Sequence, residues 1–213
     1  MKIYVVGDSI SIQYGPYLQA YLNGVIDYSR KEGEEEALLN LDHPQGANGG
    51  DSGMVLSFLR AKKDGMGINA DLLLLNCGLH DIKTNPVTTT KQVPIDKYRE
   101  NLKAIVQTVN EMKCPMVWIR TTPCCEETHN REGMAFHRFS ADCDAYNLAA
   151  DQIMDAAGVT MLDLHTFTLN LGAELYCDHV HFNDHVRQKQ AAFIAGWILA
   201  FAKVRVTHPF PKA

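Results

Sequence analysis

The sequence predicts an α/β fold in which helices cover both faces of a parallel sheet. Four apolar runs, at residues 3–6, 71–76, 116–120 and 159–163, are typical of buried strands because they are continuously apolar rather than alternating. A weaker strand is expected near residues 25–29. Helix-like stretches separate these runs, and a repeated order of strand and then helix is typical of a parallel sheet.

Three longer segments carry apolar residues at helical spacing, and we expect helices over residues 95–112, 141–157 and 186–203. In the first of them, Leu102 and Val106 stand about one turn apart, so both side chains fall on one face. The last segment is the most apolar of the three. Apolar helix faces of this kind can pack on the two faces of the sheet and bury its apolar side chains.

Length and composition fit one globular domain over residues 1–213. Hydrophobic residues make up 46% of the chain and charged residues 21%, and no internal repeat or linker is visible. The net charge is -5 and there is no basic stripe, which excludes nucleic acid as the main partner. No apolar run reaches the ~20 residues that span a bilayer, and the N-terminus does not resemble a signal peptide. We therefore expect a cytoplasmic protein with no membrane partner, and the sequence leaves its oligomeric state undetermined.

Residues that can carry chemistry follow the predicted strands. Ser9 follows the first strand, the stretch 78–81 follows the second, and Asp178 and His181 come after the last. In a parallel sheet these carboxyl ends share one edge, where ligands bind. A serine hydroxyl becomes a good nucleophile when a histidine takes its proton, and a carboxylate can fix the tautomer of that histidine. We predict that Ser9 is the nucleophile, His181 the base and Asp178 the group that orients it.

Four short motifs together resemble the four blocks of the SGNH (GDSL-type) hydrolases. They are Gly-Asp-Ser-Ile at 7–10, the glycine Gly50, Gly-Leu-His-Asp at 78–81 and Asp-His-Val-His at 178–181, and they span most of the chain. The resemblance implies a flavodoxin-like, three-layer α/β/α sandwich with a five-stranded parallel sheet. It also implies hydrolysis of an ester or thioester without a cofactor.

The same match implies an oxyanion hole made by the backbone N–H groups of Ser9 and Gly50. The family's third block usually supplies an asparagine side chain as a further donor, and His80 holds that place here. A histidine ring nitrogen can also donate a hydrogen bond, so we expect His80 to substitute for the asparagine. Asp8 and Asp81, which belong to these blocks, are expected to contribute to substrate binding.

His179 lies inside the fourth block and is expected at the rim of the site, where it would also bind substrate. The resemblance favours a small-molecule or carbohydrate ester with a short acyl group, most simply acetyl, because the chain lacks an apolar lipid-binding cap. The long segment 124–140 has little periodicity and is a candidate wall or lid.

Two alternative substrates or functions stay open at this point. A lysophospholipase or thioesterase of the same family would need an apolar tunnel, for which Met54, Met66, Met134 and Phe136 are possible lining residues. A sugar-binding protein on a degraded hydrolase scaffold would not need the serine at all. The replacement of asparagine by histidine in the third block is the one observation that favours it.

Two other motifs offer rival chemistry. A second Gly-Asp-Ser ends at Ser52, but it precedes the helical run 54–59, so Asp51 or Ser52 is expected to cap a helix. The segment 179–185 is rich in imidazole and carboxylate groups, which bind transition metals. Its spacing differs by one residue from the H-x-H-x-D-H signature of metallo-β-lactamase-like hydrolases, and we expect no metal.

Overall fold

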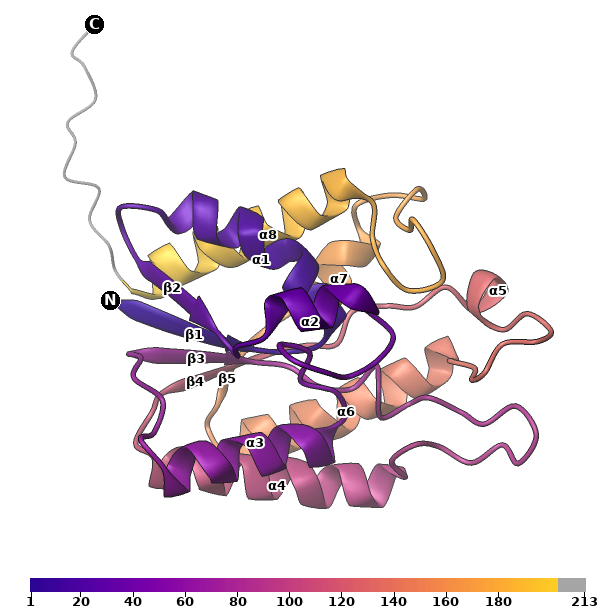
Figure 1. The fold of residues 1–213 in the computed structure, drawn as a ribbon, viewed down its shortest axis with the longest axis horizontal. Helices are drawn as coiled ribbons and strands as arrows, with labels where there is room; N and C mark the ends of the chain where they lie inside the picture. The colour runs from indigo at the N-terminus through magenta and orange to yellow at the C-terminus, as the bar shows by residue number, and fades with distance from the viewer. Residues whose placement is uncertain (203–213) are drawn as a thin grey trace, which may run out of the picture.

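The computed structural model describes residues 1–202, so residue 203, the last of the expected C-terminal helix, lies outside the described residues. Its centre is a parallel five-stranded sheet with the order β2-β1-β3-β4-β5 (Figure 1). The strands are β1 (Lys2–Val6), β2 (Asp27–Arg30), β3 (Leu72–Leu75), β4 (Met116–Ile119) and β5 (Thr160–Leu162). The four predicted apolar runs and the weaker one are therefore all strands, and the predicted fold class is confirmed.

Helices form a layer on each face of the sheet (Figure 1). One layer holds α1 (Ser9–Leu22), α7 (Leu164–Leu169) and α8 (Asp184–Phe201), and the other holds α3 (Ser52–Asp64), α4 (Ile95–Glu111) and α6 (Ser140–Ala156). The short helices α2 (Glu34–Leu39) and α5 (Glu126–His129) lie in connections. The three predicted long helices correspond to α4, α6 and α8, with boundaries within two residues of those expected for the part that the structure describes.

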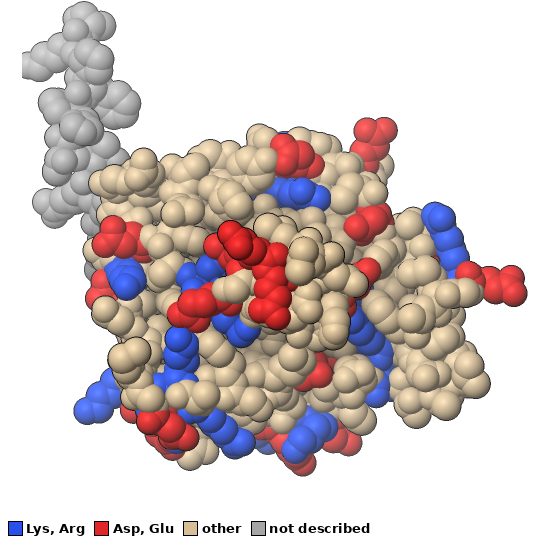
Figure 2. Space-filling view, viewed as in Figure 1, with Lys and Arg blue, Asp and Glu red and all other residues tan. Residues whose placement is uncertain are grey.

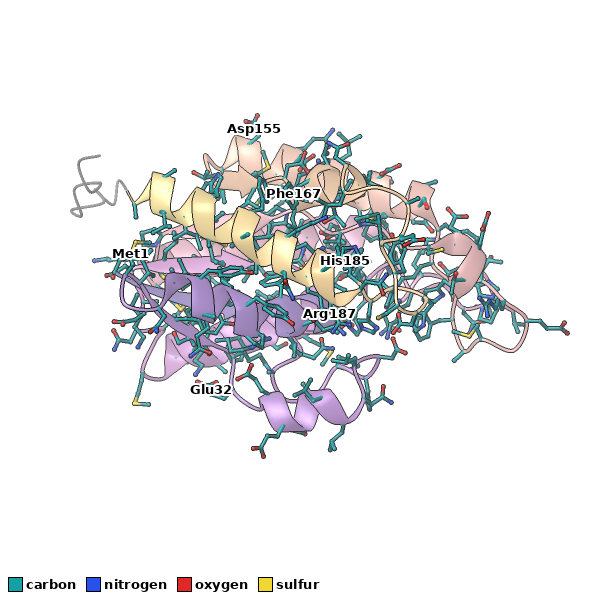
Figure 3. All side chains as sticks on the ribbon, turned by 90° about the horizontal axis from the view of Figure 1, so that it is seen from above. Met1, Glu32, Asp155, Phe167, His185 and Arg187 are labelled. Carbon is teal, nitrogen blue, oxygen red and sulfur yellow. The ribbon has the colours of Figure 1, made fainter. Side chains whose placement is uncertain are left out.

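The core lies on both faces of the central strands. All four leucines of β3 are at most 1% exposed, and Trp118 of β4 is fully buried. Burial on both faces explains why these strands are continuously apolar. Helices α1 and α8 lie side by side over one face, with His185 and Arg187 near the N-terminal end of α8 (Figures 1 and 3).

The acidic run after β2 is solvated, as its composition predicts. Helix α2 carries Glu34, Glu35 and Glu36 in its first turn, and acidic side chains gather over this helix on the surface (Figure 2). Negative charge at a helix N-terminus is favourable because it opposes the helix dipole. This run therefore stabilises α2 and gives no sign of a site.

Candidate active site

Ser9 stands where β1 turns into α1. The strand ends at Val6, and the side chain of Asp8 accepts the backbone N–H of Ile10 at 3.0 Å, which caps the helix that Ser9 begins. A side chain at Gly7 would lie 2.9 Å from Ser11 Cβ, so the tight turn requires glycine. The chain thus holds the Ser9 side chain at the carboxyl edge of the sheet, with 5% of the residue exposed.

His181 reaches the same point from the loop that precedes α8. Its Nε2 lies 2.8 Å from Ser9 Oγ, and its Nδ1 lies 2.7 Å from Asp178 Oδ2. The other oxygen of Asp178 accepts the backbone N–H groups of Val180 and His181 at 2.8 and 2.7 Å. Asp178 therefore holds both the backbone and the ring of His181, and the structure brings the three predicted residues together in the predicted order.

The electrostatics of this cluster favour a carboxylate at Asp178. Partial burial on its own raises the pKa of Asp178, but the hydrogen bonds from the His181 ring and from the two backbone N–H groups outweigh it. The pKa of Asp178 is therefore held below its usual range. An ionised Asp178 accepts the Nδ1–H of His181 and leaves Nε2 free to accept a proton from Ser9.

The three expected oxyanion donors differ in the hydrogen bonds that they already make and in their burial. The N–H of Ser9 occupies the first position of α1, where the helix itself offers no acceptor. Gly50 has a φ of +70°, and its N–H donates to Asn48 Oδ1 at 3.0 Å, so an oxyanion would have to share this donor. His80 is 3% exposed and lies in the turn after β3. Burial, followed by the charges of Lys83 and Arg138, lowers the pKa of His80 well below its usual value, so the ring is neutral.

Asp8 and Asp81, which are expected to bind substrate, are both buried, and each accepts a backbone N–H within the chain. Asp8 is 2% exposed and caps α1, and Asp81 is fully buried. Both oxygens of Asp81 lie close to the backbone N–H of Ser52, at 2.9 and 3.0 Å, at the start of α3. Burial raises the pKa of Asp81 to about 8. These two carboxyl groups position helices beside the site and present almost no surface to a substrate.

His179 forms a hydrogen bond with Asp42, which the sequence analysis did not identify as a site residue. Its Nε2 lies 3.1 Å from Asp42 Oδ1, and its ring centroid lies 6.0 Å from that of His181. The hydrogen bond with His179 lowers the pKa of Asp42 to about 2. On its other side the ring of His179 meets the buried His129 edge-on, with 4.5 Å between centroids. Asp42 therefore ties the loop after α2 to the loop that carries His181.

The segment 124–140, the candidate wall, carries a buried arginine that the sequence gave no sign of. Arg138 is 2% exposed, its Nε donates to the carbonyl of Leu79 at 2.7 Å, and its Nη1 lies 2.8 Å from His129 Nε2. A buried arginine in a segment without periodicity leaves no pattern by which it could have been found. It packs this wall against the turn that holds His80.

The second Gly-Asp-Ser motif and the segment 179–185 do not form a second nucleophile or a metal site within residues 1–202. Ser52 is fully buried at the start of α3, where Asp51 accepts the N–H groups of Gly53 and Met54 and so caps the helix as predicted. Across residues 1–202, no group of three or more histidine, cysteine or acidic side chains is arranged to hold a metal. No helix within this range is long and apolar enough to cross a membrane.

Residues 5–189 match the model of the GDSL-like lipase/acylhydrolase family. The chain belongs to this family. None of the curated proteins matches it, but solved structures resemble this GDSL-family member closely in fold. An acetyl xylan esterase superposes with a TM-score of 0.68 at 17% identity, covering 93% of this chain and 100% of that one.

Two further structures show the same fold. A psychrotrophic esterase from Pseudoalteromonas sp., inhibited by monoethylphosphonate, has a TM-score of 0.63 at 15% identity over 95% of this chain and 99% of that one. A carbohydrate acetylesterase from Sinorhizobium meliloti has a TM-score of 0.61 at 13% identity over 94% and 99%. These likenesses fix the SGNH-type fold of this GDSL-family member, and its substrate is argued separately below.

Proposed function

We propose that this protein is a serine esterase that removes a short acyl group, most simply acetyl, from a carbohydrate through an acyl-serine intermediate. The observation that carries the proposal is the pair of short hydrogen bonds around His181, 2.8 Å to Ser9 Oγ and 2.7 Å to Asp178 Oδ2. A serine, a base and an orienting carboxylate at these distances are the arrangement that acyl transfer needs.

The steps follow from the geometry. Ser9 Oγ attacks the carbonyl carbon of the ester while His181 Nε2 takes the hydroxyl proton. The tetrahedral intermediate then collapses, and the protonated His181 gives its proton to the leaving alcohol. Water attacks the acyl-serine, His181 takes a proton from that water, and the acid leaves as the proton returns to Ser9 Oγ. Asp178 stays ionised and stabilises the imidazolium of His181 in both halves of the reaction.

The negative oxygen of each intermediate requires donors that are already in place. The N–H of Ser9 is free of helical bonding, and the N–H of Gly50 can be shared between Asn48 and the oxyanion. His80 would donate from its neutral ring. Because burial and nearby cations keep His80 neutral, this role does not depend on its gaining a proton.

Several observations favour a small acyl group over a lipid tail. Met66, one of the residues considered as lining for an apolar tunnel, is fully exposed after the end of α3. Met54 lies beside Gly50 but is 40% exposed, so it faces open surface rather than a closed tunnel. Two of the structural neighbours are an acetyl xylan esterase and a carbohydrate acetylesterase. Both considerations point to a small ester on a polar, carbohydrate-like alcohol.

The test combines covalent labelling with turnover. Wild type is treated with a fluorophosphonate probe, its intact mass is measured, and hydrolysis of 4-nitrophenyl acetate is followed alongside. We expect one adduct and measurable turnover, both lost in Ser9→Ala. Ser52→Ala, which changes the serine of the second Gly-Asp-Ser, is the matched control and should still be labelled. A folded wild type that gives no adduct and no turnover would refute the covalent mechanism.

The size of the acyl group is tested with 4-nitrophenyl esters of two, four, eight and twelve carbons. We expect kcat/KM to be highest for the acetyl ester and to fall with chain length. A maximum at eight or twelve carbons would favour the lysophospholipase or thioesterase alternative instead.

A further inference from the structure

Two cations lie against one aromatic ring beside the candidate active site. The Nζ of Lys83 lies 4.3 Å from the ring centroid of Phe136, and the guanidinium carbon of Arg138 lies 4.9 Å from it. We call these three residues the Lys83–Phe136–Arg138 cluster. It joins the turn after β3 to the candidate wall, residues 124–140.

The cations of this cluster have only neutral acceptors within residues 1–202. Lys83 Nζ donates to the backbone carbonyl of Asp42 at 3.0 Å. Arg138 bonds the carbonyl of Leu79 and the ring of His129. Buried charges in proteins are normally paired with an opposite charge, because an unpaired one costs solvation free energy. Within the described residues neither cation forms a direct ion pair, and the carboxylates of Asp42 and Asp8 act on both only through space.

Burial lowers the pKa of both cations, and the nearby carboxylates of Asp42 and Asp8 offset this in part. Burial first, and then the charge of Arg138, lower the pKa of Lys83 to about 8. Burial likewise lowers the pKa of Arg138, which is 2% exposed. An anion placed next to Lys83 would offset both effects, since opposite charge favours the protonated amine.

The cluster is connected to the candidate active site through His80 and Asp42. The backbone N–H of Lys83 points to the carbonyl of His80 at 3.4 Å, and Asp42, whose carbonyl receives Lys83 Nζ, pairs with His179 next to His181. The charge of Lys83 is also one of the causes that lower the pKa of His80. Lys83 is thus linked to the turn that holds the predicted oxyanion donor and, through Asp42 and His179, to the loop that holds the predicted base.

The same lysine lines a hollow of about 400 Å³ between the turn 83–92 and the wall. The lining also includes the polar side chains of Asn85 and Gln92, and a second lysine, Lys91, whose charge is met by Asp142. Lys83 is the half-buried cation of this hollow that has no such partner within the described residues. Its ammonium group can form a charge-assisted hydrogen bond with a carboxylate.

We propose that Lys83, backed by Arg138, binds a carboxylate group of the ester substrate next to Ser9. This inference rests on the proposed esterase function and narrows its substrate class to acidic esters. The carboxylate can belong to the alcohol part, as in an acetylated uronic acid, or to the acyl part. The overall charge of -5 disfavours anions, so a preference for them would have to come from this local cluster.

The experiment compares each acidic ester with a neutral counterpart of similar size. One arm uses an O-acetylated methyl uronoside and its methyl ester, and the other uses 4-nitrophenyl hemisuccinate and 4-nitrophenyl butyrate. We expect wild type to favour the acidic member of at least one arm by about tenfold to a hundredfold in kcat/KM, the range of a charge-assisted hydrogen bond. The arm that shows the preference identifies which part of the substrate carries the carboxylate.

Three variants connect the preference to the cluster. Lys83→Met should abolish the ratio of acidic to neutral kcat/KM mainly through KM, and Lys83→Arg, which keeps the charge, should retain most of it. Lys103→Met removes an exposed lysine on α4 and should keep the wild-type ratio. Equal or lower kcat/KM for the acidic ester in both arms of wild type would overturn the proposal, as would a preference that survives in Lys83→Met.

The outcomes separate this inference from the proposed function. Hydrolysis of the neutral esters that depends on Ser9, without an acidic preference, would leave the esterase standing and remove the carboxylate site. Binding of the free methyl uronoside acid to Ser9→Ala, followed by calorimetry, tests the site without turnover. Binding that is at least tenfold weaker in Ser9→Ala combined with Lys83→Met supports the site, and no binding, together with no acidic preference, refutes it.

Discussion

Replacement of Asp81 by asparagine is expected to change how stability depends on pH, because this carboxyl group is fully buried. Its oxygens face the N–H of Ser52, and burial raises its pKa from 3.8 to about 8. Between those pH values the folded protein keeps a proton that the unfolded chain has released. The free energy of unfolding of wild type therefore loses a contribution from this group as the pH rises from about 4 to 8.

The size of the effect follows from the difference in pKa. Each pH unit within this window lowers the free energy of unfolding by at most about 1.4 kcal/mol. The largest loss expected between pH 4 and pH 7 is therefore about 4 kcal/mol. Asparagine keeps a carbonyl oxygen for the N–H of Ser52 and does not titrate. The difference in free energy of unfolding, Asp81→Asn minus wild type, should therefore grow by about 1 kcal/mol per pH unit from pH 5 to pH 8.

Urea denaturation followed by circular dichroism at pH 5, 6, 7 and 8 measures this difference. Asp155→Asn changes a carboxylate that points into solvent from α6 (Figure 3) and should show no such growth. A constant difference for Asp81→Asn across the four pH values would refute the reasoning, because it would mean that the carboxylate stays ionised at the N-terminus of α3.

Three further changes test the site and the turns that hold it. Asp178→Asn should lower kcat by about 10⁴-fold in steady-state assays, since an amide can donate to Nδ1 of His181 and so favour the wrong tautomer, and it carries no charge to stabilise the imidazolium; a loss below tenfold would contradict this. His80→Ala should cost about 10²–10³ in kcat with little change in KM, and His80→Asn should recover part of it, whereas equal loss in both would exclude a donor role. Gly46→Ala should lower the free energy of unfolding by more than Gly158→Ala in urea titrations. Both glycines have positive φ, but an added Cβ at the first would collide with a backbone carbonyl while the second has open space.

Much of the fold could be predicted because the sheet is buried on both faces. The leucines of β3 form a run that only a covered strand explains, and α4 shows clear helical spacing. Helix α1 was harder to predict, because Gly15 and Pro16 interrupt its pattern and nearly all of its first turn is buried. Helix α7 is six residues long, too short for a periodic signal.

The candidate site was predicted only for the residues that belong to short motifs after the strands. Ser9 and His181 stand in recognisable motifs, so their meeting follows from the parallel sheet. Asp42 and Arg138 are single residues in loops, and the contacts that place them join positions far apart in the chain, 137 residues apart for Asp42 and His179. The sequence does not reveal such long-range contacts, so it gives no reason to single out Asp42 and Arg138.

The hydrogen bond between Ser9 and His181 joins residues that are 172 positions apart in the chain. Synthesis proceeds from the N-terminus, so the serine leaves the ribosome long before the histidine exists. The loop with His181 leads directly into α8, which packs beside α1, and Tyr17 of α1 forms a hydrogen bond with Asp184 at the start of α8. A nascent chain that lacks its last fifth therefore carries an inert alcohol. Ser9 can therefore act as a nucleophile only after the last segment of the chain has been made and folded.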